Sequence, residues 1–367
     1  MKVADRRRLR RARMAALGLA PALGTPTAPV SALSVTRELG ALQAQDYLSG
    51  VWSLGVRSGL TKAEIEQAVQ QRQVVRTWPM RGTIHFVPAE DARWMSRLLA
   101  GRVIGSLRAR YEQLSITERE IGTAAGVFAE HLTEPVRRPD VIALLEAAGI
   151  DPSGQRAYHL VGHHCMTGLL CQGPMIGKQP SFVLIDSWVP ASREPTREEG
   201  LATVVERYLR GHGPVTEKDV AGWLAHPLGL AREALALLGD RVLREELDGE
   251  TWLTHADVPR RAAGPTGVHL LPQWDEFLLG YRSRDLTLPD EHLARVVPGR
   301  NMVFQPTLVI DGEVAGTWKR QESASGVRVE VSPFSPLTTT ARRGLEASSA
   351  AYGQFLGRAV ELRVTEP

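Results

Sequence analysis

Two glutamines near the start of the chain, Gln43 and Gln45, stand one residue apart and are followed directly by Asp46. A carboxamide accepts a hydrogen bond through its oxygen and donates through its nitrogen, so such a pair could orient a water molecule for attack. On a regular helix this spacing turns the two side chains about 200° apart, whereas on extended chain both point to one side. If both serve one pocket, the preceding helix must end or distort there. Two solvated polar residues at a helix end would fit the spacing as well.

Asp46 is compatible with two roles. Its carboxylate could act as a general base and stabilise a developing cation. It could also cap a helical segment that begins at Tyr47, which is the role that its position favours.

Other chemistry-bearing motifs are weak. The stretch from Gly173 to Gln179 falls one residue short of a phosphate-binding P-loop and ends in Gln where Ser or Thr should bind magnesium. The sequence has no dinucleotide-binding glycine motif, zinc-protease motif or nucleophile elbow. The histidines and cysteines between His159 and Cys171 lack the paired spacing of zinc ligands, so we expect core or groove residues there. We therefore expect neither a metal nor a cofactor.

The elements around the glutamines have the order of a winged helix. Apolar residues at Val35, Leu39 and Leu42 predict a first helix, and residues 47–56 predict a second short one. Thr61 and Glu64 form a capping box that predicts a third. Two β-rich runs on either side of Met80-Arg-Gly then read as a hairpin.

The same order recurs twice, with a period of about 80 residues. A connecting helix is predicted near residues 89–113. In the second copy, a capping box of Thr117 and Glu120 predicts a helix that runs to 131. Further helices are predicted over 138–148 and 155–167, with a hairpin over 169–185. The third is predicted to have helices over 196–208, 216–224 and 228–238, and a hairpin that turns at Asp248-Gly249, a strong hairpin signal.

The ends of the chain complete the predicted architecture. Six arginines between Arg6 and Arg13 predict a basic opening helix instead of a signal peptide, because Pro21, Gly24 and Pro26 break the apolar run that follows. The C-terminal part reads as strands with a turn at Asp311-Gly312 and a last helix over 340–362. The predicted fold is α+β, with three tandem winged-helix units (1–115, 116–192 and 193–262) and a C-terminal β-rich domain with a terminal helix (263–367).

Composition places the chain among ordinary globular proteins. It has 43% hydrophobic residues and a net charge of +3, from 44 Lys and Arg against 41 Asp and Glu, which excludes disordered, collagenous and membrane-spanning classes. Only five of the basic residues are lysines. The arginines could fork onto phosphates, although a GC-rich genome gives the same bias. Winged helices most often bind nucleic acid, and Arg72, Arg76 and Arg81 surround the first predicted hairpin.

Four segments together resemble the AlkZ family of winged-helix DNA glycosylases, in this order: 39–45, 76–88, 270–279 and 308–318. The match extends over nearly the whole chain. The resemblance implies tandem winged helices in a C-shaped arrangement. It implies excision of N7-alkylated guanines, including bulky adducts and interstrand crosslinks made by DNA-alkylating antibiotics. It also implies that Gln43 and Gln45 are the catalytic pair; a sister branch has Asp at the second position.

The predicted function is that of a monofunctional DNA glycosylase, which gives antibiotic self-resistance or alkylation repair. An enzyme that also cut the strand would usually need an amine nucleophile, and no lysine stands beside the glutamines. We expect a cytoplasmic, nucleoid-associated monomer that binds double-stranded DNA carrying alkylated guanine and no membrane. Catalysis is expected from Gln43 and Gln45. Residues expected to bind DNA or line the pocket are Asp46, Arg72, Arg76, Arg81 and His85.

Several roles stay open at this stage. Trp78 is expected to pack the core, while His85 could line the pocket or be a satisfied core residue. The acidic runs 194–199 and 245–246 are expected to face away from DNA. The alternative function is that of a non-catalytic winged-helix DNA-binding protein, either a transcriptional regulator or an architectural protein. Such a protein needs neither the glutamine pair nor the C-terminal β-rich motifs.

Overall fold

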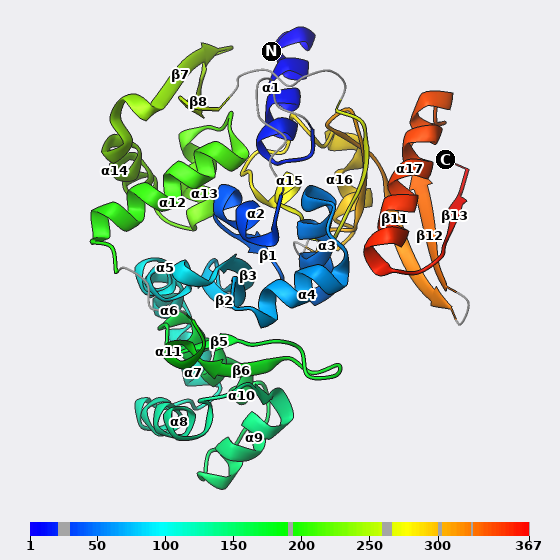
Figure 1. The fold of residues 1–367 in the computed structure, drawn as a ribbon. Helices are drawn as coiled ribbons and strands as arrows, with labels where there is room; N and C mark the ends of the chain where they lie inside the picture. Colours follow the sequence, from blue (N-terminus) through cyan, green and yellow to red (C-terminus); the bar gives the residue numbers. More distant parts are fainter. Residues whose placement is uncertain (21–29, 190–193, 259–265, 300–302, 324–325, 367) are drawn as a thin grey trace. The chain divides into compact units, whose positions relative to one another are not determined.

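The computed structural model describes residues 1–20, 30–189, 194–258, 266–299, 303–323 and 326–366 (Figure 1). Helices and strands are mixed along the whole chain, as the predicted α+β class requires. The chain forms two compact units. Unit 1 comprises Met1–Ile65, Ala202–Trp223 and Pro227–Pro367, and unit 2 comprises Glu66–Leu201 and Leu224–His226. Unit 1 thus holds both ends of the chain.

The four predicted domains do not coincide with these units. The boundary after residue 115 falls inside unit 2. Those after residues 192 and 262 lie outside the described residues. The order of elements nevertheless follows the three predicted copies, as described below, and the division into winged-helix domains stays a prediction.

The N-terminal part of unit 1 contains the elements that carry the glutamines. They are α1 (Val3–Ala16), α2 (Ala32–Leu39), the two-residue strand β1 (Leu42–Gln43) and α3 (Tyr47–Ser58), followed by α4 (Lys62–Gln70), which continues into unit 2. The predicted basic opening helix is therefore confirmed as α1. The predicted capping box before α4 is also present, since Thr61 and Glu64 exchange hydrogen bonds between side chain and backbone.

The third predicted copy matches the observed elements closely. These are α12 (Arg197–His212), α13 (Glu217–Leu224), α14 (Leu228–Leu238), the short 3-10 turn Gly239–Arg241, and the strands β7 (Val242–Leu247) and β8 (Glu250–His255). Asp248 and Gly249 join the two strands with φ values of 56° and 77°. The predicted two-residue hairpin turn is thus confirmed.

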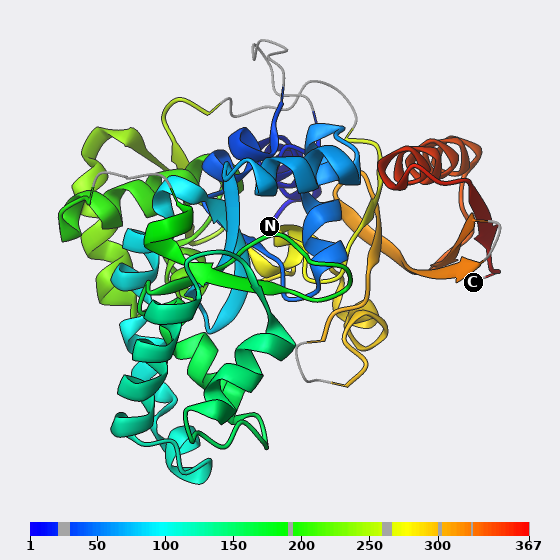
Figure 2. The same ribbon diagram turned by 60° about the horizontal axis from the view of Figure 1, so that its bottom comes forward.

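The rest of unit 1 is a five-stranded sheet with helices. Its elements are β9 (Val268–Leu271), α15 (Glu276–Leu279), α16 (Asp290–Val296), β10 (Thr307–Ile310), β11 (Glu313–Ser323), β12 (Gly326–Pro333), α17 (Thr339–Leu356) and β13 (Val360–Val364). The strand order is β13-β12-β11-β10-β9, antiparallel except for the parallel pair β12 and β13. Helix α17 lies along one face of this sheet (Figure 2).

The predicted terminal helix over 340–362 is wrong at its C-terminal end. Gly357 has a φ of 63° and stops α17 after Leu356 in the left-handed conformation that glycine adopts without a Cβ penalty. The following residues, Val360–Val364, pair with β12 as a strand. The predicted turn at Asp311-Gly312 is confirmed between β10 and β11.

Unit 2 contains the second predicted copy. Its helices are the 3-10 turn Ala89–Asp91, α5 (Ala92–Leu99), α6 (Gly101–Ser106), α7 (Arg108–Gln113), α8 (Glu118–His131), α9 (Arg138–Ala147), α10 (Arg156–Met166) and α11 (Ile185–Trp188). Its strands are β2 (Val74–Met80), β3 (Thr83–Pro88), β4 (Val136–Arg137), β5 (Leu170–Gln172) and β6 (Ser181–Leu184). The single connecting helix that we predicted is in fact three short helices, α5 to α7.

Each unit has its own aromatic core. In unit 2, Trp78 is 3% exposed and stacks with Phe182 at 6.5 Å between ring centroids, so its predicted packing role is confirmed. In unit 1, Trp52 and Trp318 both contact Tyr352, with ring centroids 4.9 and 5.2 Å from it. In the described part of the chain, no helix combines the length and apolar character needed to cross a bilayer.

Candidate functional site

The two glutamines lie on a non-helical segment between α2 and α3. Helix α2 ends at Leu39, and Gly40, with a φ of 78°, turns the chain out of the helix. Gln43 then lies in the extended pair β1 and is buried, while Gln45 is half-buried. The predicted continuation of the first helix to Leu42 is wrong. Gln43 is in the strand and Gln45 in the bend that leads into α3, so neither side chain has the opposed direction that a regular helix would give the pair.

Asp46 has the capping role that its position favours. It is the N-cap of α3, and its Oδ2 accepts a hydrogen bond of 2.8 Å from the backbone N–H of Ser49. This bond satisfies one of the helix's otherwise unpaired N–H groups. The carboxylate is exposed. The alternative role as a general base stays a hypothesis.

Helix α3 is held by a buried ion pair with the segment that precedes α15. Arg57 donates from Nη1 and Nη2 to the two carboxylate oxygens of Asp275 at 2.8 and 2.7 Å, with both side chains at most 3% exposed. Ser53 Oγ donates to the same carboxylate at 2.8 Å. Asp275 in turn accepts from the N–H of Phe277 and so caps α15. The segment 270–279, which carried part of the family resemblance, therefore fixes the helix that begins at Asp46.

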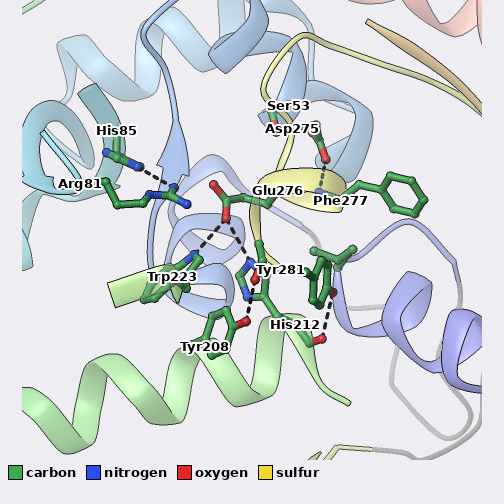
Figure 3. Close-up of polar contacts among 12 residues, drawn as sticks. Ser53, Arg81, His85, Tyr208, His212, Trp223, Asp275, Glu276, Phe277 and Tyr281 are labelled. Carbon is green, nitrogen blue, oxygen red and sulfur yellow. Dashed lines mark hydrogen bonds and ion pairs between the residues drawn. The ribbon is translucent and has the colours of Figure 1, made fainter. Parts of the chain in front are cut away.

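A second buried carboxylate, Glu276, points away from that ion pair (Figure 3). Its Oε2 accepts from the indole Nε1 of Trp223 at 2.9 Å and lies 3.3 Å from His212 Nε2. Glu276 is 1% exposed and His212 is fully buried. Tyr208 stacks on His212 with 4.6 Å between ring centroids. Burial raises the pKa of Tyr208 well above its ordinary value, so its hydroxyl stays a donor, to Gly280 O at 2.6 Å. We call Glu276, His212, Trp223 and Tyr208 the Glu276 cluster.

Sequence reasoning missed this cluster. The resemblance covered Glu276, but no role was assigned to it. The available signal was two adjacent acids inside the apolar run Trp274-Asp-Glu-Phe-Leu-Leu279, because charged residues are rarely buried unless they are paired.

The hairpin of unit 2 places Arg81 and His85 together. Arg81 and Gly82 form its tip with φ values of 58° and 69°, and Met80 pairs with Thr83. His85 Nδ1 lies 2.9 Å from the carbonyl oxygen of Thr83, which can only accept, so Nδ1 carries the proton. Nε2 then accepts from Arg81 Nη2 at 2.8 Å (Figure 3). His85 is fully buried, and it holds the guanidinium of Arg81.

The other two arginines of the hairpin differ in exposure. Arg72 is exposed, with its guanidinium carbon 4.5 Å from the ring centroid of Trp188, a cation–π contact that leaves the group at the surface of unit 2. Arg76 is 5% exposed and lies between β3 and β5 in the sheet. Arg76 would have to become exposed before it could contact a phosphate.

A cavity begins directly beside the glutamine segment in unit 1. It has a volume of ≈ 210 Å³. Asp46 and Ser49 from the start of α3, Gln273 and Arg320 provide its polar lining, and Trp52 is among its apolar residues. Among the described residues, no three His, Cys, Asp or Glu side chains come together as metal ligands.

Comparisons with known proteins agree on one family. A family model described as DNA glycosylase AlkZ-like matches residues 36–355. A relative from Streptomyces sahachiroi, named an interstrand DNA cross-link repair glycosylase, is 25% identical over 350 residues, which cover 90% of this chain and 92% of the relative. The solved structure of Streptomyces sahachiroi DNA glycosylase AlkZ covers all of both chains with a TM-score of 0.80 and 23% identity. The likeness to that structure supports the same mixed α and β fold.

Proposed function

Because this chain belongs to the family of AlkZ-like DNA glycosylases, we propose that it hydrolyses the N-glycosidic bond of N7-alkylated guanine in double-stranded DNA. The chain is a DNA glycosylase; the lesion, the catalytic pair and the biological role are the proposal. The observation that carries the proposal is the break between α2 and α3, which puts Gln43 on the short strand β1 and Gln45 in the bend before α3, outside either helix.

The proposed reaction suits neutral side chains. Alkylation at N7 makes guanine cationic, so the base leaves readily and the sugar develops oxocarbenium character. The bond between C1′ and N9 breaks and its electron pair neutralises the base. Water then bonds to C1′ and releases its proton to solvent. Gln43 and Gln45 would orient this water through their oxygens and donate from their nitrogens. The products are free N7-alkylguanine and an abasic site in an intact strand.

The cavity next to Asp46 supports the proposal that the enzyme accepts bulky adducts. The cavity that starts at Asp46 has space for a substituent much larger than methyl and offers both polar and apolar walls. Arg72 and Arg81 provide groups that can pair with phosphate. The three repeats of helix, helix, helix and hairpin support the proposal that winged-helix units bind the duplex. In the cell, such an enzyme would protect DNA from an alkylating antibiotic or repair alkylation damage.

An excision assay on matched duplexes tests this proposal. One duplex carries N7-methylguanine, a second a bulky N7 adduct, a third an N7–N7 interstrand crosslink, and a fourth unmodified guanine. We expect release of the alkylated base and alkali-labile abasic sites from the first two duplexes at least, with no strand cleavage before alkali. Absence of excision from all three lesions, together with tight binding to one unmodified sequence, would instead identify a non-catalytic DNA-binding protein.

A further inference from the structure

The Glu276 cluster contacts the point where α2 gives way to the glutamine segment. A Cβ added at Gly40 would lie 3.2 Å from Cη2 of the Trp223 ring. A Cβ at Gly211, the neighbour of His212, would lie 2.6 Å from the carbonyl oxygen of Glu38. The first distance is tighter than most real Cβ contacts and the second is shorter than any, so the end of α2 packs closely on α12 and α13. The position of the Trp223 ring thus sets where the chain leaves the helix.

The cluster is packed as tightly on its other side. A Cβ at Gly280, just after α15, would lie 2.5 Å from His212 Cδ2. Tyr281 donates from its hydroxyl to His212 O at 2.9 Å. The His212 ring is therefore held between α15 and Tyr208, and both His212 and Trp223 direct a ring nitrogen at the same oxygen of Glu276.

Burial of the Glu276 carboxylate carries a free-energy penalty, although it holds two rings in place. Taking it out of water costs several kcal/mol before its hydrogen bonds are counted, and well-packed apolar residues often give equal or greater stability. The benefit of a carboxylate is directional, because charge-assisted hydrogen bonds fix the orientation of both donors. The ring that Glu276 orients, Trp223, is the one that contacts Gly40.

We propose that Glu276 is a positioning residue of the glycosylase reaction, which orients Trp223 and through it fixes the turn that presents Gln43. The inference rests on the proposed role of Gln43 in catalysis. Glu276 is buried and does not touch substrate; it acts through the indole and the backbone at Gly40. Loss of its directional bonds should therefore lower the rate of the chemical step and leave DNA affinity unchanged.

Two conservative variants test this role. Glu276→Gln keeps the size of the side chain and an acceptor oxygen but removes the acid, and Trp223→Phe keeps an aromatic ring near Gly40 but removes the N–H donor. The matched control is Trp94→Phe, since Trp94 in unit 2 is 7% exposed and donates from its indole to Asp91 Oδ1 at 3.0 Å. For each variant we would measure the single-turnover excision rate on N7-methylguanine duplex, the Kd for DNA and the Tm.

Glu276→Gln and Trp223→Phe are expected to slow excision at least tenfold with Kd unchanged within twofold. Trp94→Phe, which also loses one buried indole hydrogen bond, is expected to lower Tm and to keep the rate within twofold. A rate kept within twofold in both test variants, or an equal loss in the control, would overturn the inference.

Hydrogen–deuterium exchange of the peptide spanning residues 40–46 gives a readout independent of substrate. This exchange should be faster in Glu276→Gln and Trp223→Phe than in Trp94→Phe at equal Tm. Equal exchange in all three variants would refute the positioning role. An inactive wild-type enzyme would instead refute the proposed lesion, and the exchange result would still decide the role of Glu276.

Discussion

At the scale of single residues, the proposed chemistry depends on neutral donors and acceptors. Gln43 is buried and Gln45 is half-buried, so both can hold a water molecule apart from bulk solvent. A cationic leaving base needs less proton transfer than a neutral one, and orientation then supplies much of the rate. Asp46, the acid beside them, already accepts a hydrogen bond at the start of α3.

Removal of either carboxamide should therefore affect the chemical step. We expect Gln43→Ala and Gln45→Ala to lower the single-turnover excision rate of N7-methylguanine by about 10²-fold each, the size of effect seen when one donor to a transition state is lost. DNA affinity, measured by fluorescence anisotropy, should stay within a few fold. Full activity in both variants would remove the two glutamines from the mechanism.

Substitutions at Asp46 can separate its role as the cap of α3 from a role as general base. Asp46→Asn keeps an acceptor for the Ser49 N–H, whereas Asp46→Ala removes it and should lower stability by about 1 kcal/mol. If Asp46 only caps α3, the Asn variant keeps both stability and excision rate. Thr117→Ala, which removes the cap of α8, is the control and should cost similar stability with the rate unchanged. A slow but stable Asn variant would establish a role as general base.

Sequence reasoning reached residues whose role is local and missed those defined by distant partners. The cap at Asp46 could be predicted from the helical segment that follows it. The role of Glu276 could not, because its partners Trp223 and His212 precede it by 53 and 64 residues. Burial of Arg76 was missed for the same reason, since β5 covers a strand that reads as an exposed wing in isolation.

At the scale of elements, helix α3 connects the glutamine segment to the C-terminal part of unit 1. Its N-terminus is Asp46, and its C-terminal turn carries Arg57. Besides the ion pair with Asp275, Arg57 Nε donates to Leu17 O at 2.8 Å, and the indole of Trp52 donates to Leu270 O at 2.7 Å. Directional hydrogen bonds and the ion pair thus fix the position of helix α3 along its length.

Loss of one partner of this ion pair should be severe. Arg57→Ala leaves the Asp275 carboxylate buried without its bidentate partner, and we expect a loss of about 3–5 kcal/mol in the free energy of unfolding. Urea denaturation followed by tryptophan fluorescence would measure it. The control is Arg137→Ala, which breaks an exposed pair with Asp140 and should change stability little. A loss below 1 kcal/mol for Arg57→Ala would show that the pair does not hold α3.

The order of the elements could be predicted because helix caps and turns depend on residues that are close together in the sequence. Thr117 with Glu120 starts α8 and Asp248-Gly249 joins β7 to β8, as predicted. The predicted helix ends were wrong where a single glycine stops the helix although the residues beyond it have an apolar spacing typical of helices. Gly40 stops α2 before Leu42, and Gly357 stops α17 so that Val360–Val364 can pair as a strand. Strand pairing with β12 is a non-local contact, which a helical pattern in sequence does not reveal.

At the scale of the whole molecule, a number of the arginines form ion pairs within each unit. In unit 2, Arg93 and Arg97 lie within 4 Å of the acidic run at Glu194. In unit 1, Arg8 pairs with Glu245 at 2.8 Å. The predicted acidic runs are therefore partners of arginines, and their orientation relative to DNA stays a prediction. The small net charge of +3 reflects the similar numbers of basic and acidic residues, 44 and 41.

The stability of unit 2 should depend on pH through His164. This residue is 4% exposed. Burial, together with the nearby His163, lowers the pKa of His164 to about 4, and its Nε2 donates to Ile121 O at 3.1 Å. The folded state therefore holds His164 in its neutral form. The folded state has its full stability above pH 6.5. As pH falls toward 4, the unfolded chain takes up the proton first, and the free energy of unfolding drops by up to about 3 kcal/mol.

Thermal melts between pH 7.5 and 4.5 would measure this dependence. The His164→Asn variant, which keeps a donor for Ile121 O, should lose less stability on acidification than the wild-type chain. His131→Asn, at an exposed position, should melt with the wild-type pH dependence. Identical pH dependence of His164→Asn and wild type would exclude His164 as the titrating group.

The placement of Arg57 and Asp275 also has a consequence for synthesis of the protein. The two residues are 218 positions apart, and all of unit 2 is translated between them. During translation, helix α3, whose N-cap is Asp46, is made long before its partner Asp275. Unit 2 can fold first, because its residues are complete much earlier. A nascent or prematurely terminated chain therefore carries the glutamines without the partners that fix them until Asp275 has been translated.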